Sequence, residues 1–226
     1  MRIVHAAGVE GAREGAGLVV VIDVLRAFTV AAVALSRGAR ESLLVGTLEE
    51  ARRLAARVPG SVLSAEEDGL PVPGVAVSNS PAAIEALPMS GRTLIQRTSA
   101  GTQGVVAAGD REVLAAALVV ASATAREISR RGPETLTLVA MGEPFGHVED
   151  RACALYLEGL LTGRPADLER LLSPLRASDR YRRVESGLWP GFPPRDLEIG
   201  LEVDAFSFAM PVAPEGGLHR LRRLPA

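Results

Sequence analysis

Residues 18–38 constrain the fold of this chain more than any other stretch. The run Leu-Val-Val-Val-Ile at 18–22 is typical of a strand that is buried on both faces of a sheet. Residues 27–35 are apolar and predict a helix, which Gly38 is placed to stop. A buried strand, a short turn and an apolar helix in this order indicate an α/β protein.

Asp23 and Arg26 lie in the turn between that strand and that helix. In open α/β sheets, ligands bind in the crevice beyond the carboxyl ends of the strands. An aspartate and an arginine three residues apart at such an end suit a site that holds a metal ion and an anion. The alternative is a structural ion pair that caps the helix, but the expected position in a crevice favours the site.

The rest of the chain alternates between strand and helix patterns as far as about residue 161. Thr47 and Glu50 form a capping box, and Ser80-Pro81 is typical of a helix entry. Strands are expected at 2–5, 18–22, 42–45, 61–64, 92–96, 116–121, 135–141 and 204–210. Helices are expected at 27–35, 48–57, 81–87, 102–108, 122–131, 150–161, 165–172 and 174–186. This alternation predicts a largely parallel sheet.

The length of 226 residues suits one domain spanning 1–226. Hydrophobic residues make up 47% of the chain, which is enough for a sizeable core. A glycine-rich connection is expected before residue 18. Residues 165–226 are expected to form a helical and strand extension packed on the α/β part, with a basic tail from 214 onward at the periphery.

Composition excludes several classes of function. The net charge of −2 argues against nucleic acid and acidic membranes as partners. All 25 basic residues are arginine, so lysine chemistry is excluded and anion binding relies on arginine, backbone N–H groups or a metal. The single cysteine, Cys153, excludes an intrachain disulfide and is expected in the core. No signal peptide or membrane span is expected, so we predict a cytoplasmic protein, and a homodimer by general frequency.

Four polar loops each follow a predicted strand, and the carboxyl ends of parallel strands meet at one edge of a sheet. Carboxylates that gather there need a cation, and oxygen ligands without a histidine or cysteine cluster favour Mg²⁺. Each acidic pair taken alone has the alternative of a solvated turn. The candidate metal ligands are Asp23, Glu66, Glu149 and Asp150.

Residues 97–102 read Arg-Thr-Ser-Ala-Gly-Thr and form a candidate anion cradle at a helix N-terminus. An ordinary helix cap is the alternative. Asn79 and Ser80 are weaker candidates, because Asn-Ser-Pro is also a common capping sequence. The candidate substrate-binding residues are Asn79, Ser80, Thr98, Ser99, Gly101 and Thr102, with Arg97 beside them.

Five segments, in this order, resemble motifs of the 2-phosphosulfolactate phosphatase family. They are 23–39, 65–81, 96–105, 120–125 and 149–160. The resemblance implies a Mg²⁺-dependent enzyme with a three-layer α/β/α sandwich around a largely parallel or mixed sheet. It also implies hydrolysis of 2-phospho-3-sulfolactate to 3-sulfolactate and phosphate, in coenzyme M biosynthesis. The matching motif residues are Asp23, Arg26, Glu66, Gly69, Asn79, Ser80, Pro81, Glu149, Asp150 and Cys153.

The resulting hypothesis is metal-assisted hydrolysis of a small phosphorylated organic acid. Arg26 and Arg97 would neutralise the phosphate and a second acidic group, and Asp23 is the first choice for a nucleophile. These three are the candidate catalytic residues. One alternative is a non-catalytic protein that binds a phosphorylated or sulfonated acid without a metal. Another is a phosphatase for a different organic acid phosphate.

Overall fold

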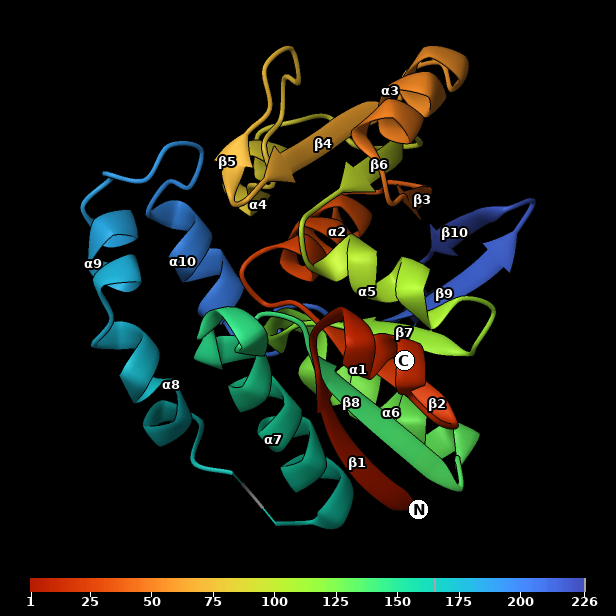
Figure 1. Ribbon diagram of the computed structural model, residues 1–226, viewed down its shortest axis with the longest axis vertical. Helices are drawn as coiled ribbons and strands as arrows, with labels where there is room; N and C mark the ends of the chain where they lie inside the picture. The colour runs from red at the N-terminus through yellow and green to blue at the C-terminus, as the bar shows by residue number, and fades with distance from the viewer. Residues whose placement is uncertain (165, 226) are drawn as a thin grey trace.

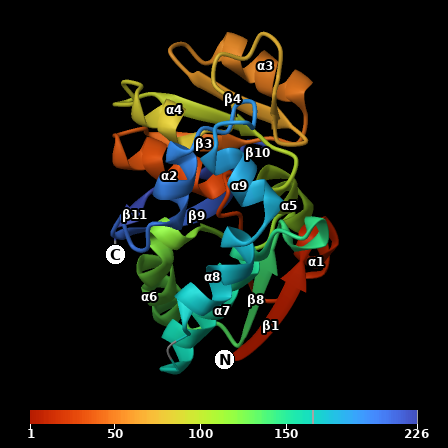
Figure 2. The same ribbon diagram turned by 90° about the vertical axis from the view of Figure 1, so that its left-hand side faces the viewer.

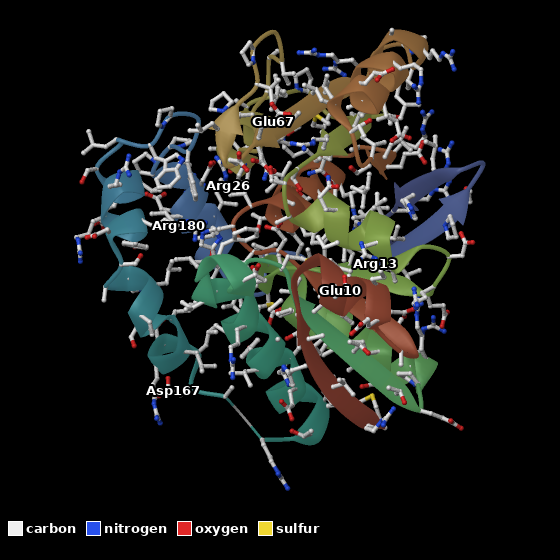
Figure 3. The ribbon with its side chains drawn as sticks, in the orientation of Figure 1. Glu10, Arg13, Arg26, Glu67, Asp167 and Arg180 are labelled. Atoms are coloured by element: carbon white, nitrogen blue, oxygen red, sulfur yellow. The ribbon has the colours of Figure 1, made fainter. Side chains whose placement is uncertain are left out.

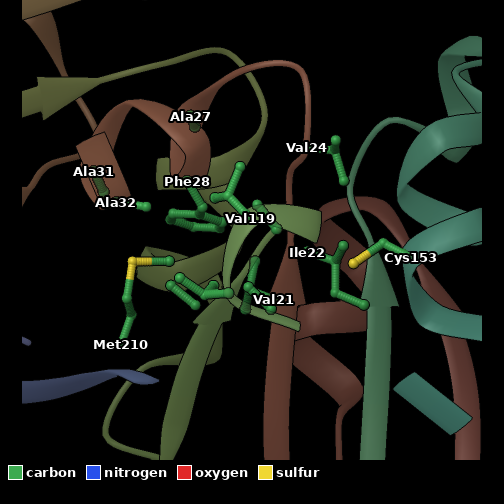
Figure 4. Close-up of a cluster of buried hydrophobic side chains, with 14 of the residues drawn as sticks. Val21, Ile22, Val24, Ala27, Phe28, Ala31, Ala32, Val119, Cys153 and Met210 are labelled. Atoms are coloured by element: carbon green, nitrogen blue, oxygen red, sulfur yellow. The ribbon is translucent and has the colours of Figure 1, made fainter. Parts of the chain in front are cut away.

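The computed structural model describes residues 1–164 and 166–225. Strand β2 (Leu18–Ile22) has the predicted bounds, and all five of its side chains are buried. Helix α2 (Ala27–Ser36) follows it and is buried from Ala27 to Leu35, as an apolar helix must be. Figure 4 shows part of this core, in which Phe28 of α2 gathers with Val119 and Met210 beside β2.

The strands form one mixed sheet with two parallel sets that are separated by an antiparallel hairpin (Figure 1). The first set is, in spatial order, β1 (Arg2–Ala7), β8 (Thr135–Ala140), β2 and β7 (Val113–Ala116). The second set is β3 (Glu41–Leu44), β6 (Thr93–Arg97) and β4 (Val62–Glu67). The hairpin between them is β9 (Phe208–Glu215) and β10 (Leu218–Leu221). Short antiparallel additions are β5 (Leu70–Pro71) and β11 (Leu224–Pro225).

Helices cover both faces of the sheet, which confirms the α/β sandwich (Figure 2). On one side lie α1 (Gly8–Glu14) and α5 (Gly101–Ala108), and on the other α6 (Ala121–Arg131) and α7 (Val148–Thr162). Helix α3 (Leu48–Arg57) packs on β4 and β6, while α4 (Pro81–Glu85) packs on α2 and α10 (Arg195–Leu201). Helices α8 (Leu168–Arg176) and α9 (Asp179–Glu185) run along the outside (Figure 2). Within 1–164 and 166–225, no helix has the length and apolar character that crossing a membrane requires.

Two predictions in the first half of the chain are wrong. The expected glycine-rich connection contains α1, which packs against α5 and buries Ala12. The strand predicted at 116–121 is β7, which ends at Ala116 and is followed by a 3₁₀ turn, Leu118–Val120. Residues 113–121 are apolar throughout, so no pattern within them marks where the strand ends. The pairing of β7 with β2 and β9 fixes its position.

The predictions for the C-terminal segment need larger corrections. Pro174 lies inside α8 rather than at the start of a helix, and the break comes at Ser178, which caps α9. The strand predicted at 204–210 begins at Phe208 and continues to Glu215. The tail that was expected at the periphery forms β10 in the middle of the sheet, between β9 and β3. The buried Leu221 and the pairing of Arg220 with buried Glu41 hold it there.

Candidate active site

A pocket of about 280 Å³ opens where β2, β4, β6 and β8 end. The prediction that these loops gather assumed one parallel sheet, yet β9 and β10 separate the two parallel sets. Neighbouring strands are rotated by roughly 20 to 25°, so over the five steps from β2 to β6 the sheet turns by roughly 100 to 125°. Three antiparallel pairings make the second parallel set run opposite to the first. A twist of this size offsets much of that reversal, and loops from both sets line the one pocket.

The pocket is lined by acidic residues and by basic and aromatic residues. The carboxylates that line it belong to Asp23, Glu66, Asp68 and Asp150. Arg26 and Arg180 supply positive charge, and His147, Trp189 and Phe192 supply rings. Figure 3 shows Arg26 and Arg180 near each other, where the C-terminal helices approach the body of the protein.

Asp23 is held directly at the end of the buried strand β2. Its Oδ1 accepts a hydrogen bond from Ala27 N–H at 3.0 Å. Burial raises the pKa of the carboxyl to about 6, the N–H groups of Ala27 and Gly101 oppose that rise, and the charge of Glu66 adds to it. A Cβ on Gly101 would lie 2.7 Å from Asp23 Oδ2, so only glycine lets α5 begin this close to the carboxylate.

Asp150 and Glu149 begin α7 but face different surroundings. Asp150 Oδ1 and Oδ2 accept hydrogen bonds from Val24 N–H and Gly142 N–H, each at 2.7 Å. Burial, and then the charge of Asp23, raise the pKa of Asp150 well above its usual value. Glu149 does not line the pocket as far as the described residues show, and its Oε1 pairs with Arg180 at 2.6 Å.

Glu66 ties the loop after β4 to the loop after β6. Its carboxylate accepts hydrogen bonds from the backbone N–H groups of Ser99 and Gly69. The Ser99 hydroxyl in turn accepts a hydrogen bond from Asp68 N–H at 2.9 Å. These contacts place Glu66, Asp68 and Ser99 on one wall of the pocket.

The Arg26 guanidinium is fixed by groups far away in the sequence. Its Nη1 donates to Asp196 Oδ2 at 3.1 Å and to the Gly191 carbonyl, and its carbon lies 4.0 Å from the Phe192 ring centroid. Asp196 Oδ1 accepts a hydrogen bond from the Ser80 hydroxyl at 2.7 Å. Asp196 is fully buried, so the paired charge keeps Arg26 in one position inside the protein.

Several predicted site residues lie behind the pocket wall, as far as the described residues define it. Arg97 donates to the Glu66 carbonyl at 2.6 Å and therefore braces β4. Thr98 and Thr102 bond to each other at the start of α5. The Thr102 hydroxyl accepts from Thr98 N–H at 2.8 Å, and the Thr98 hydroxyl accepts from Thr102 N–H at 3.1 Å. Ser80 caps α4 and holds Asp196. The predicted residues that line the pocket are Asp23, Arg26, Glu66, Asn79, Ser99 and Asp150.

Comparison with known proteins identifies the family. A sequence model described as 2-phosphosulpholactate phosphatase matches residues 5–181. The chain belongs to the 2-phosphosulpholactate phosphatase family. The expectation of a phosphoric monoester hydrolase is confirmed at the level of this family.

Individual relatives are similar over much of the chain. A probable 2-phosphosulfolactate phosphatase of Bacillus subtilis is 35% identical over 208 residues, 91% of both chains. One of Symbiobacterium thermophilum is 32% identical over 181 residues, 78% of both chains. One of Deinococcus radiodurans is 39% identical over 124 residues, 54% of this chain and 52% of the relative.

Sequence reasoning predicted Arg26 but missed Arg180 and the aromatic residues of the pocket. Arg180 lies at the end of the segment that matches the family, while Trp189, Phe192 and Asp196 lie beyond it. The available signals were the chain's single tryptophan and the proline-rich loop around it. Nothing local to Arg180 distinguishes it from the other arginines of α9, because its role depends on Glu149 and the pocket.

The donor set of this family member suits a hard cation in its chemistry. Asp23 and Asp150 are buried acids with raised pKa values, the charge of Asp23 contributes to the raised pKa of Asp150, and all candidate donors are oxygens. Among the described residues, no three His, Cys, Asp or Glu side chains are grouped closely enough to hold a metal alone. Mg²⁺ usually takes one or two carboxylates together with water and substrate phosphate, and the site fits this mode.

Proposed function

We propose that this protein hydrolyses 2-phospho-3-sulfolactate to 3-sulfolactate and phosphate in a Mg²⁺-dependent reaction. The observation that carries the proposal is that several carboxylates and two arginines line the same pocket. Family membership and the names of the relatives support this substrate. A small acid with a phosphoryl group and further acidic groups needs both, carboxylates to hold a cation and arginines to pair with its negative charges.

In this proposal one or two of the carboxylates of Asp23, Glu66 and Asp150 would hold Mg²⁺ together with water and the substrate phosphate. When bound, the ion polarises the phosphoryl group and neutralises charge that develops on it. Among the carboxylates, Asp23 remains the first choice for a nucleophile, because it follows a rigid buried strand and Ala27 N–H fixes its Oδ1. Hydrolysis breaks the bond between phosphorus and the C2 oxygen, and water supplies hydroxide to phosphorus and a proton to that oxygen.

Arg26 would neutralise negative charge on the substrate. Its guanidinium is already oriented by Asp196, the Gly191 carbonyl and the Phe192 ring, so little side-chain entropy is lost when an anion binds. The Ser99 hydroxyl and Asn79 also line the pocket and would orient oxygens of the substrate.

The test is phosphate release from 2-phospho-3-sulfolactate and other phosphorylated carboxylic acids, with Mg²⁺ and with EDTA. We expect release that requires Mg²⁺ and is fastest with 2-phospho-3-sulfolactate. Preference for another compound would replace the substrate and keep the enzyme. No release from any compound, with ligand binding that EDTA leaves unchanged, would support a binding protein and overturn the proposal.

A further inference from the structure

Two arginines share one aromatic ring in the pocket. The guanidinium carbons of Arg26 and Arg180 lie 4.0 Å and 5.8 Å from the centroid of Phe192. Figure 3 shows the two residues arriving from different parts of the chain, Arg180 from α9. Like charges this close repel each other in a largely buried place, and a bound anion relieves that repulsion. Asp196 and Glu149 each offset part of this positive charge, and an anion between the two guanidinium groups would add charge-assisted hydrogen bonds to it.

The two guanidinium groups are not equivalent. The Arg26 side chain is 3% exposed and donates to Asp196 and to the carbonyls of Gly191 and Gly69. The Arg180 side chain is 16% exposed and donates to Glu149 Oε1 at 2.6 Å and the Leu25 carbonyl at 3.2 Å. A guanidinium carries five N–H donors in a planar fork that matches a carboxylate or a sulfonate. Arg180 is thus anchored in the pocket wall and more accessible from the pocket than Arg26.

The charged side chains of the pocket decide where each acidic group of the substrate binds. Acidic groups that stay on the organic part of the substrate are repelled by the carboxylates of Asp23, Glu66 and Asp150. A phosphoryl group that reacts among these carboxylates, with a cation, therefore leaves the remaining acidic groups of the substrate for the two arginines.

We propose that Arg180 is a specificity-determining residue that binds an acidic group which the reaction does not transfer, the sulfonate or the carboxylate of the substrate. This inference rests on the proposed function. It predicts that the pocket selects compact phosphate esters that carry a further anionic group, and that Arg180 provides that selection.

The test measures kcat and KM for the wild type and Arg180→Ala with three compounds. They are 2-phospho-3-sulfolactate, 2-phospholactate, which lacks the sulfonate, and 2-sulfoethyl phosphate, which lacks the carboxylate. We expect kcat/KM for the full substrate to fall about 30-fold or more, chiefly through KM, as for other truncated charge pairs. For one of the two truncated compounds, kcat/KM should fall less than about threefold. The acidic group that this compound lacks is then the group that Arg180 binds.

Two further variants separate recognition from structure. Arg180→Lys keeps the charge but loses the fork, so its kcat/KM should be intermediate. Arg182→Ala removes an exposed arginine of the same helix that pairs with Asp179, and its kinetics should match the wild type. Activity of Arg180→Ala on the insensitive compound would also show that the variant is folded, although Glu149 has lost its partner.

An equal fall with all three compounds, or no fall with any, would overturn the role of Arg180. If the wild type releases no phosphate from any compound, the proposed function fails separately. In that case, the role of Arg180 is tested by calorimetric binding of 3-sulfolactate, which retains both acidic groups. Binding at least tenfold weaker in Arg180→Ala than in the wild type would support the role, and equal binding would exclude it.

Discussion

The carboxyl group of Asp23 is buried where α5 begins, and burial raises its pKa from 3.8 to about 6. At pH values between 3.8 and about 6, the Asp23 carboxyl is protonated in the folded protein and ionised in the unfolded chain. The stability that this proton brings is lost as pH rises through about 6, and above that value the fold has to carry a buried charge. Asp23 therefore destabilises the metal-free fold at neutral pH, as residues placed for chemistry often do.

Asp23→Asn tests this sign. In EDTA, we expect the variant to be more stable than the wild type, and its advantage to grow by about 1 kcal/mol between pH 5 and pH 8. Urea unfolding at both pH values measures it, and Asp110→Asn, which changes an exposed carboxylate, is the control. The same variant should release phosphate at least about 100-fold more slowly. An advantage that is independent of pH would contradict the raised pKa.

Helix α10 shows how an element outside the matched segment supports the site. Its Asp196 accepts hydrogen bonds from Ala82 N–H at the start of α4 and from Ser80, and it pairs with Arg26. One carboxylate therefore connects α10, the first turn of α4 and the arginine that follows β2. The pair is almost completely buried, so loss of either partner leaves an uncompensated charge inside the protein.

Asp196→Ala should cost about 3 to 5 kcal/mol in the free energy of unfolding, because Arg26 stays buried without its partner. Glu198→Ala is the matched control on the same helix. Glu198 is exposed and pairs with Arg195 on the surface, so its loss should change stability by less than about 1 kcal/mol. Denaturant unfolding compares them. Similar stability of the two variants would show that Asp196 does not hold Arg26 in the way described.

At the scale of the whole molecule, the C-terminal hairpin joins the two halves of the sheet. Strand β9 pairs with β7, and β10 pairs with β3. Pocket residues come from both halves, Asp23 and Asp150 from one and Glu66 and Ser99 from the other. The last strands of the chain therefore hold together a site that was assembled from its earlier parts.

Deleting residues 218–226 should abolish cooperative folding, because β9 and β3 both lose a neighbour in the middle of the sheet. Deleting only 223–226 removes the short β11 at the side and should be tolerated. Circular dichroism on heating and size-exclusion chromatography measure both variants. A chain without 218–226 that unfolds cooperatively and keeps activity would refute the central role of β10.

Local patterns predicted what depends on near neighbours in the chain. The bounds of β2 and α3, the cap of α3 by Thr47 and the cap of α4 by Ser80 all rest on residues within about one turn. The loops with Asp23, Glu66, Ser99 and Asp150 were also predicted, since polar residues after buried strands mark the edge of a sheet. Their meeting in one pocket is confirmed by the lining, while their chemical roles stay predictions.

The sequence by itself determined β2, α2, α3 and the caps at Thr47 and Ser80, because hydrophobic periodicity and capping act over a few residues. Only the tertiary structure decided that the basic tail belongs in the sheet and that Arg180, Phe192 and Asp196 complete the site. Arg220 lies half-buried against the sheet because the buried Glu41, 179 residues away, accepts its hydrogen bonds at 2.8 Å and 2.9 Å. Such pairings depend on which segments meet after folding, and the pattern around either partner carries no record of the other.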